Sequence, residues 1–150
     1  MSKITLLQEY DSPVLLETAS EGWIYRISNK YVVKVNACKR YKKDMFHEIL
    51  ITRLLYSFGI SVPEPITCDY VKVDNEVKMG YIMEFIDGKA FDDETISDKD
   101  LILAKKLLDK EVKLSLKLGF SFPDDCPQWI FTKDKKIKII DFTKWNYRGL

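Results

Sequence analysis

The sequence predicts an α+β protein whose strand-rich first part is followed by a more helical second part. Three observations lead to this prediction. Residues 1–86 contain five β-rich runs and one helical pattern. A long amphipathic pattern with a capping signal comes next, and a short two-strand pattern follows near the end of the chain. Side chains repeat every two residues in strands and about every 3.6 in helices, so the two kinds of pattern can be told apart.

The first three strands are expected at 14–16, 23–27 and 31–35, in "VLL", "WIYRI" and "YVVKV". A polar link of three residues joins the last two runs, which is a hairpin signal. Before them, the small-residue segment "ETASEG" predicts a turn. Gly22 ends this segment and can take backbone angles that other residues avoid.

A helix is expected from Lys42 to Phe58, because apolar residues recur there at intervals of three and four. Gly59 is the expected stop, and two prolines at 63 and 65 prevent continuation. Strands at 66–73 and 77–86 should then form an antiparallel pair. The expected buried face of the helix consists of Met45, Ile49, Thr52, Leu55 and Tyr56, with Phe46, Leu50 and Leu54 beside it.

The second part begins where Asp87-Gly88 breaks the strand pattern, which divides the chain into 1–86 and 87–150. Ser97 precedes Asp100 by three positions, a capping signature at the start of a long helix. Leucines at helical spacing carry that helix to Gly119. The last hairpin is expected from strands at 129–131 and 136–141, with a turn at 132–135.

The composition describes a packed intracellular protein. The chain of 150 residues is 46% hydrophobic and 13% aromatic, ample for one core. A net charge of +1 gives no general electrostatic case for nucleic acid or an anionic membrane. Cys38, Cys68 and Cys126 are expected as reduced thiols, and a single histidine without C-x-x-C argues against zinc. No signal peptide or membrane span is expected, so the predicted location is the cytoplasm.

Two charged residues in apolar surroundings are the first candidates for a functional site. Lys34 interrupts the strand "VVKV", and a lysine seldom lies against a core face without a negative partner. Glu48, in the helix that follows, can point at Lys34 and form an ion pair that holds the ammonium toward a ligand phosphate. The alternatives are an edge strand with Lys34 in water and a solvent-facing Glu48.

Two further segments have the composition of ligand sites. The strand exit "MEFIDG" can leave backbone groups unpaired for a flat heterocycle, with Met83 at the back of the cleft. Gln128 and Asp141 lie at the two ends of the last hairpin, where an amide oxygen and a carboxylate can share a magnesium ion. The alternatives are an ordinary strand exit and, for Asp141, the first residue of a turn.

Together these elements resemble the protein-kinase-like fold: a five-stranded antiparallel N-lobe with one helix, then a reduced helical C-lobe. The chain most resembles small atypical kinases, in particular the kinase of the KEOPS tRNA-modification complex, and more distantly RIO kinases and aminoglycoside phosphotransferases. Roughly residues 15–145 carry the resemblance, through "SEGWIYRISNKYVVKV", "CKRYKK", "FGISVPEPI", "YIMEFIDG" and "IKIIDFTKW". It implies that the C-lobe is truncated after Leu150.

The resemblance implies ATP and Mg²⁺ as ligands. Lys34 matches the strand lysine that contacts the α and β phosphates, and Glu48 matches its helix partner. Asp141 matches the magnesium-binding aspartate, and Gln128, thirteen positions earlier, stands where the family has asparagine. The full set of implied nucleotide contacts is Gly22, Lys34, Glu48, Met83, Glu84 and Ile86.

The catalytic loop departs from the family pattern. The expected aspartate falls on Pro123, five residues before Gln128, and Asp124 and Asp125 follow it. Either acid is a candidate catalytic base, and the alternative is that both are surface turn residues. Three functions therefore stay open: an atypical kinase or ATPase, a pseudokinase that regulates a protein partner, and an interaction domain with an empty cleft.

Overall fold

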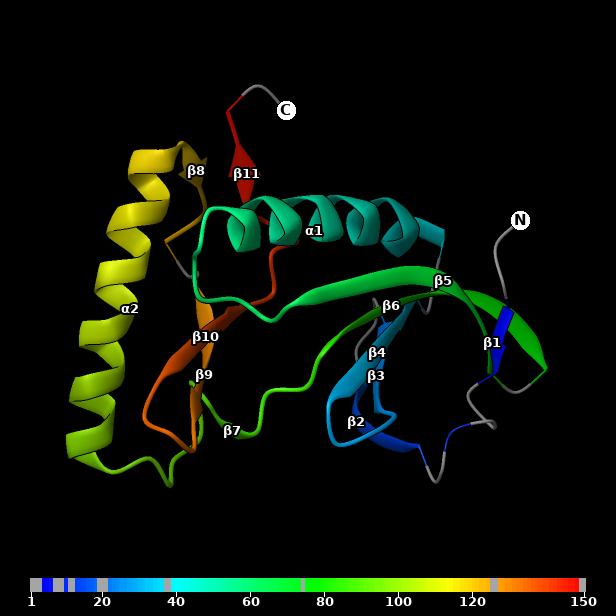
Figure 1. Cartoon of the computed structure of the whole chain (residues 1–150), viewed down its shortest axis with the longest axis horizontal. Helices are drawn as coiled ribbons and strands as arrows, with labels where there is room; N and C mark the ends of the chain where they lie inside the picture. Colours follow the sequence, from blue (N-terminus) through cyan, green and yellow to red (C-terminus); the bar gives the residue numbers. More distant parts are fainter. Residues whose placement is uncertain are drawn as a thin grey trace. The chain divides into compact units, whose positions relative to one another are not determined.

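The structure, a computed structural model, describes residues 4–6, 10, 13–18, 22–36, 39–73, 75–124 and 127–148. These residues form an α+β fold, as the sequence predicts, with helices α1 (Lys39–Ser57) and α2 (Asp98–Leu118) (Figure 1). The chain divides into two compact units, residues 1–49 with 64–85 and residues 50–63 with 86–150. The segment 50–63, which the sequence grouped with the first part, falls in the second unit.

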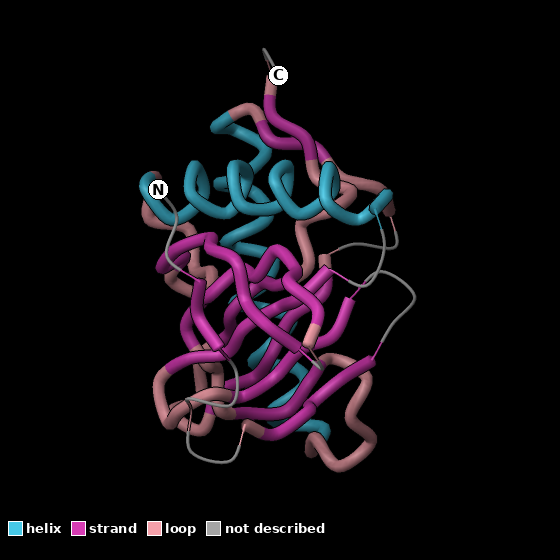
Figure 2. The backbone as a smooth tube through the Cα atoms, turned by 90° about the vertical axis from the view of Figure 1, so that its right-hand side faces the viewer, coloured by secondary structure: helices cyan, strands magenta, loops and turns pink. Residues whose placement is uncertain are grey.

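The first unit contains a six-stranded sheet in the order β1-β5-β6-β4-β3-β2. Strands are drawn in magenta in Figure 2. The five expected strands form its antiparallel portion. The sixth, β1, was not predicted and joins β5 in parallel, with Ile4 opposite Tyr70. The strands are β1 (Ile4–Leu6), β2 (Val14–Thr18), β3 (Gly22–Arg26), β4 (Tyr31–Asn36), β5 (Pro65–Val73) and β6 (Glu76–Glu84).

One face of this sheet carries a valine-rich core. Val33, Val35, Val71 and Val73 are buried in one cluster. Gly80 of β6 lies against it, and an added Cβ would stand 2.8 Å from Val71 Cγ1 and 3.0 Å from Val33 Cγ2. Such distances are too short for real side-chain contacts, so the glycine is required by the packing density of the core.

The opposite face of the sheet packs against the first half of α1. Met45 and Ile49 of the helix form a buried cluster with Met79 and Tyr81 of β6, and Cys68 and Met83 pack against it. Helical periodicity therefore identified most of the buried face. It failed for Tyr56, which is exposed although the sequence placed it on that face. Three further residues were expected beside this face. Phe46 and Leu50 are exposed, and Leu54 is partly buried.

The second unit combines α2 with two small sheets. A three-stranded sheet has the order β10-β9-β7, and β8 pairs with β11. The β9–β10 hairpin was predicted, whereas β7, β8 and β11 were not. Their bounds are β7 (Gly88–Ala90), β8 (Phe120–Ser121), β9 (Gln128–Thr132), β10 (Ile137–Ile140) and β11 (Asn146–Tyr147).

The predicted ends of α2 are confirmed. The side chain of Ser97 accepts a hydrogen bond from the backbone N–H of Asp100 at 3.2 Å, as an N-cap does. Gly119 closes the helix in the left-handed region at φ 105°. Neither helix of the described chain is long and apolar enough to cross a membrane.

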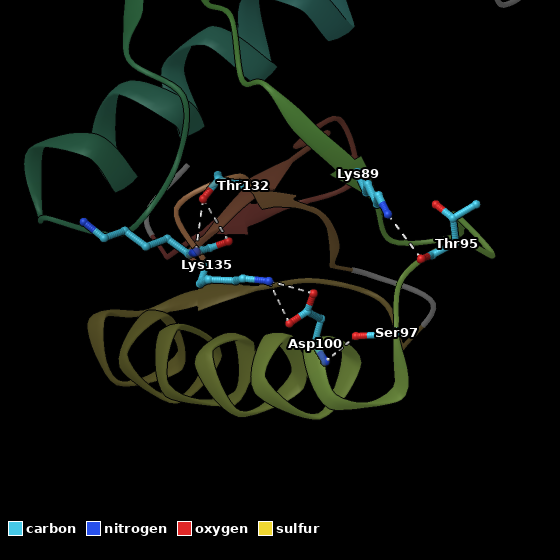
Figure 3. A network of polar contacts seen from close by, with 7 residues as sticks. Lys89, Thr95, Ser97, Asp100, Thr132 and Lys135 are labelled. Atoms are coloured by element: carbon cyan, nitrogen blue, oxygen red, sulfur yellow. Dashed lines mark hydrogen bonds and ion pairs between the residues drawn. The ribbon is translucent and has the colours of Figure 1, made fainter.

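The turn of the β9–β10 hairpin is tied to the first turn of α2 (Figure 3). Lys135 Nζ lies 3.1 and 3.0 Å from the two carboxylate oxygens of Asp100. The hydroxyl of Thr132 also donates to the carboxylate of Asp134 within the turn. These contacts fix the end of the hairpin that lies away from Gln128 and Asp141.

Candidate functional site

Lys34 and Glu48 form the ion pair that the sequence predicts. Lys34 lies in β4 opposite Ile24 of β3 and Tyr81 of β6, so it belongs to the sheet face covered by α1. Its Nζ lies 3.2 and 3.0 Å from the two carboxylate oxygens of Glu48. The side chains are 15% and 5% exposed, which rules out the alternatives of a solvated lysine and a solvent-facing glutamate.

Burial makes this pair chemically unusual. Removing two charges from water is costly, and their attraction offsets that cost only with good geometry and further hydrogen bonds. The ammonium of Lys34 is held at both carboxylate oxygens while part of its side chain stays accessible to solvent. A cation fixed in this way loses little additional freedom when it binds an anionic ligand.

The strand exit after Met83 is more fully hydrogen-bonded than predicted. The N–H of Glu84 donates to the carbonyl of Glu64 at 2.9 Å, and the N–H of Glu64 donates back to Glu84 Oε1 at 3.0 Å. The N–H of Phe85 donates to the carbonyl of Lys30 at 2.7 Å. The expectation of an unpaired backbone edge is therefore wrong for the N–H groups of Glu84 and Phe85.

Arg26 also lies in this region, although no sequence pattern pointed to it. Its guanidinium carbon lies 4.2 Å from the ring centroid of Phe85, a cation–π contact. The same guanidinium donates to the carbonyl of Ser28 and to Asn29 Oδ1. Arg26 thus holds the strand exit against the β3–β4 turn. Met83 is partly buried against the cluster under α1.

Ile86 begins the part of the chain that belongs to the second unit. It is partly buried. Among the turn and loop backbone hydrogen bonds of the described residues, none involves Ile86. Its main-chain groups therefore match the expected unpaired edge, unlike the N–H groups of Glu84 and Phe85.

Gln128 and Asp141 lie at the same end of the β9–β10 hairpin. Gln128 is the first residue of β9 and pairs in register with Ile140, the residue directly before Asp141. The hairpin thus brings the two positions together as the sequence predicts. Asp141 has φ 61°, in the left-handed region that favours glycine. The strand alternation stops there, and the direction of the carboxylate is set by this backbone conformation instead.

The neighbours of Asp141 on its C-terminal side hold it in place. Phe142 is 2% exposed and belongs to a core cluster with Ile139 and Trp145. Thr143 donates from Oγ1 to Asp141 Oδ1 at 3.0 Å. Non-glycine residues in this backbone region cost about 1–3 kcal/mol and often occur at functional sites. Asn75 and Lys135 have the same backbone conformation in turns, so the φ of Asp141 fits both the metal-ligand and the turn interpretation.

Asp141 and Gln128 would by themselves supply only two protein ligands to a metal ion. Among the described residues there is no group of three or more His, Cys, Asp or Glu side chains that can hold a metal ion. Magnesium commonly keeps several waters and takes one or two carboxylates together with substrate phosphates. The carboxylate of Asp141 and the amide of Gln128 fit a magnesium site of this kind, in which a bound phosphate supplies the remaining oxygens.

The remaining predicted residues are less informative. Gly22 opens β3, opposite Asn36 of β4. Asp124 is exposed in a turn, and Asp125 lies outside the described residues. Lys34, Glu48, Met83, Glu84 and Gly22 belong to the first unit, whereas Ile86, Asp124, Gln128 and Asp141 belong to the second.

No protein-family model matches this sequence, and no curated protein matches it.

Proposed function

We propose that this chain is a minimal atypical kinase or ATPase of the protein-kinase-like superfamily. It binds ATP with magnesium and transfers the terminal phosphoryl group to a protein, to itself or to water. The observation that carries the proposal is the buried ion pair of Lys34 with Glu48, at a strand and a helix position that match the superfamily. Enzymes of this kind act mainly by positioning phosphates and neutralising charge, which a fixed ammonium and a metal can do.

The proposed roles follow from the contacts. Lys34 binds the α and β phosphates, and Glu48 orients its ammonium. Asp141 and Gln128 hold the magnesium ion. Gly22, at the start of β3, lies beside the phosphates, and Met83 stands behind the adenine. The carbonyl of Glu84 and the main chain of Ile86 bond the adenine, because the N–H of Glu84 already donates to Glu64.

A pseudokinase is the second candidate function, and the catalytic loop favours it. The position expected to hold the base is Pro123, and Asp124 is exposed in the following turn. In this second proposal the chain binds the nucleotide and regulates a protein partner without phosphoryl transfer. If the chain is an enzyme, Asp124 or Asp125 is the base.

Nucleotide-dependent melting tests both candidates. A ligand at one hundred times its dissociation constant adds about 2.7 kcal/mol. For a chain of this size that corresponds to about 5–10 °C in Tm. We expect this rise with ATP and magnesium, a smaller rise with ATP and EDTA, and none in Lys34→Met. Absence of a rise in the wild type would contradict both nucleotide-binding proposals and favour an interaction domain.

Lys78 provides a matched control for Lys34. It lies in the same sheet, with its Nζ 3.3 Å from Glu76 and its side chain 19% exposed. Lys78→Met removes an equal charge and should keep the nucleotide-dependent rise. Equal loss in both variants would show that the rise depends on net charge rather than on Lys34.

Phosphoryl transfer separates the enzyme from the pseudokinase. We expect radiolabel from γ-labelled ATP to appear on protein or as free phosphate, and to be lost in Asp141→Asn. Lys144→Gln, an exposed position three residues further on, is the control. A wild type that melts higher with nucleotide yet transfers no label would support the pseudokinase. Full transfer by Asp141→Asn would refute the metal assignment.

A further inference from the structure

The outward face of α2 carries a row of lysines. At about 100° per residue, these lysines fall within an arc of about 60° and extend over about 27 Å of the helix. The buried residues of the helix, Ala104 and Ser115, lie on the opposite side. All members of the row are exposed: Lys99, Lys106, Lys110, Lys113 and Lys117.

This row is unusual because no acidic residue interrupts it. Exposed helix faces are commonly stabilised by glutamate–lysine pairs three or four residues apart, whereas like charges at these spacings are destabilising by similar amounts. Here Lys106, Lys110, Lys113 and Lys117 follow one another at such spacings. Asp109 relieves this repulsion at Lys113, and an external polyanion would relieve the repulsion among the other lysines.

The acids of α2 lie beside the row, and among their described contacts only that of Asp109 reaches a lysine of the row. Asp100 pairs with Lys135, as Figure 3 shows, and Glu111 accepts from the backbone N–H of Ser61 at 3.4 Å. Asp109 pairs with Lys113 at 2.8 Å from the edge of the row. The hydrogen bond to Asp109 raises the pKa of Lys113, so this lysine remains protonated.

The other four lysines of the row form no ion pair within the part of the chain that the structure describes. The net charge of +1 for the whole chain conceals this local excess, because acids elsewhere balance it. The face is thus a concentrated cationic surface on a protein that is nearly neutral as a whole.

Aliphatic side chains flank the row, Ile102 on the side of Asp109 and Leu114 on the other side. Ile102 lies between Lys99 and Lys106 and is 71% exposed, and Leu114 is 42% exposed. No arginine or aromatic residue lies on α2. Arginine forks and aromatic stacking are the chemistry that binds nucleic acids best, whereas aliphatic side chains have no partner on a phosphate backbone. Lysines with exposed aliphatic residues fit the headgroup region of a lipid bilayer.

We propose that the outward face of α2 docks on an anionic lipid surface. The ammonium groups of the row bind headgroup phosphates and carboxylates, and Ile102 and Leu114 enter the interface between headgroups and acyl chains. This docking is peripheral and reversible, since each lysine near an anionic surface contributes only about 1 kcal/mol. It does not depend on nucleotide binding.

Vesicle flotation with the full chain tests the proposal. We expect binding to phosphatidylcholine vesicles that contain 30% phosphatidylserine, and none to phosphatidylcholine alone. The triple variant Lys106→Gln, Lys110→Gln, Lys117→Gln should bind about 100-fold more weakly, from about 1 kcal/mol per lysine. Glutamine has nearly the helix propensity of lysine, so α2 should keep its circular dichroism signal.

The matched control removes three exposed lysines elsewhere: Lys30→Gln, Lys133→Gln, Lys136→Gln. It should keep wild-type binding, since the row is intact. Equal loss in both triple variants would overturn the proposal, because binding would then follow net charge alone. Absence of binding to the phosphatidylserine vesicles would overturn it directly.

Ile102→Ser distinguishes lipid from other polyanions. We expect it to weaken vesicle binding about tenfold, because the aliphatic side chain no longer enters the interface. Single- and double-stranded oligonucleotides and polyglutamate, at the same charge concentration, serve as competitors. Displacement of the wild type from vesicles by any of them at less than the lipid concentration would overturn the lipid assignment in favour of that polymer.

Discussion

Lys34 and Asp141 are held in place in opposite ways. Lys34 extends from a regular strand, and the carboxylate of Glu48 fixes its ammonium. Asp141 lies just after a strand in a left-handed conformation, and the buried ring of Phe142 anchors the backbone beside it. In the first unit the proposed functional groups are therefore themselves part of the buried interior. In the second unit the anchor and the proposed functional group are separate residues.

This difference predicts that the stability of the second unit depends on Phe142 rather than on Asp141. Phe142→Ala should lower the free energy of unfolding by about 3–5 kcal/mol, because it leaves a cavity in the core. Urea unfolding measures the change. Phe91→Ala, at an exposed phenylalanine of the same unit, should cost far less. Equal losses in the two variants would mean that the ring of Phe142 is not the anchor.

The first unit should be sensitive to the charged residue itself. Glu48→Ala leaves Lys34 buried without this carboxylate and should cost about 3 kcal/mol in urea unfolding. Glu76→Ala, which breaks the more exposed pair with Lys78, should cost less than about 1 kcal/mol.

The double variant Lys34→Met, Glu48→Leu checks the cause of that loss. Because it removes both charges from the interior, it should recover most of the stability while nucleotide-dependent melting stays abolished. A double variant as unstable as Glu48→Ala would contradict the explanation by an uncompensated buried charge.

Asp141 should show a smaller effect that depends on the backbone. Asp141→Gly relieves the left-handed strain that Asp141→Ala retains, so the glycine variant should be more stable by about 1 kcal/mol. Asn75, at φ 64° in the β5–β6 turn, provides the same pair of variants at a position without a proposed function. Both Asp141 variants should lose the magnesium-dependent part of the melting shift. A retained shift in either one would contradict the separation of anchor and carboxylate.

The smallest expected effect is on the pH dependence of stability, through Asp134 in the turn of the β9–β10 hairpin. The hydroxyl of Thr132 donates to Asp134 and lowers the pKa of that carboxyl. A lowered pKa in the folded state stabilises the fold above the unfolded pKa, and this contribution is lost as the pH falls through the folded value. Thr132→Val should therefore narrow the gap in stability between pH 7 and pH 2. Thr95→Val is the comparison variant, because it removes a similar hydrogen bond to Asp93 that lies outside the hairpin. Wild-type pH dependence in Thr132→Val would contradict the assignment.

The parts of the fold that follow from local pattern were predictable. Alternation located the five antiparallel strands, and Ser97 and Gly119 marked the ends of α2. The pairing of Lys34 with Glu48 was also predictable, since an isolated lysine in an apolar strand requires a nearby acid. These inferences succeed because each depends on a short stretch of residues or on one strong physical penalty.

The parts that depend on distant partners were not predictable. β1 consists of three residues, and its partner β5 begins at Pro65. The hydrogen bonds of Glu84 and Phe85 depend on Glu64 and Lys30, whose positions no local pattern specifies. The φ of Asp141 left only a weak signal, since aspartate tolerates the left-handed region somewhat better than most residues. Net charge likewise concealed the lysine row, because a sum over the chain loses its distribution.

The reactivity of Cys68 can report how often the structure around it opens. Its thiol lies 3.1 Å from the sulfur of Met79, beside the cluster that the first half of α1 covers. A small disulfide reagent reacts with the thiolate form of Cys68 and must first reach it. The reaction rate of Cys68 therefore depends on how often the surrounding structure opens. With Cys38 and Cys126 replaced by serine, the rate would follow the coverage of Cys68 without an added label. The same residue that fills a gap in the core can thus report, in real time, how tightly helix and sheet are closed.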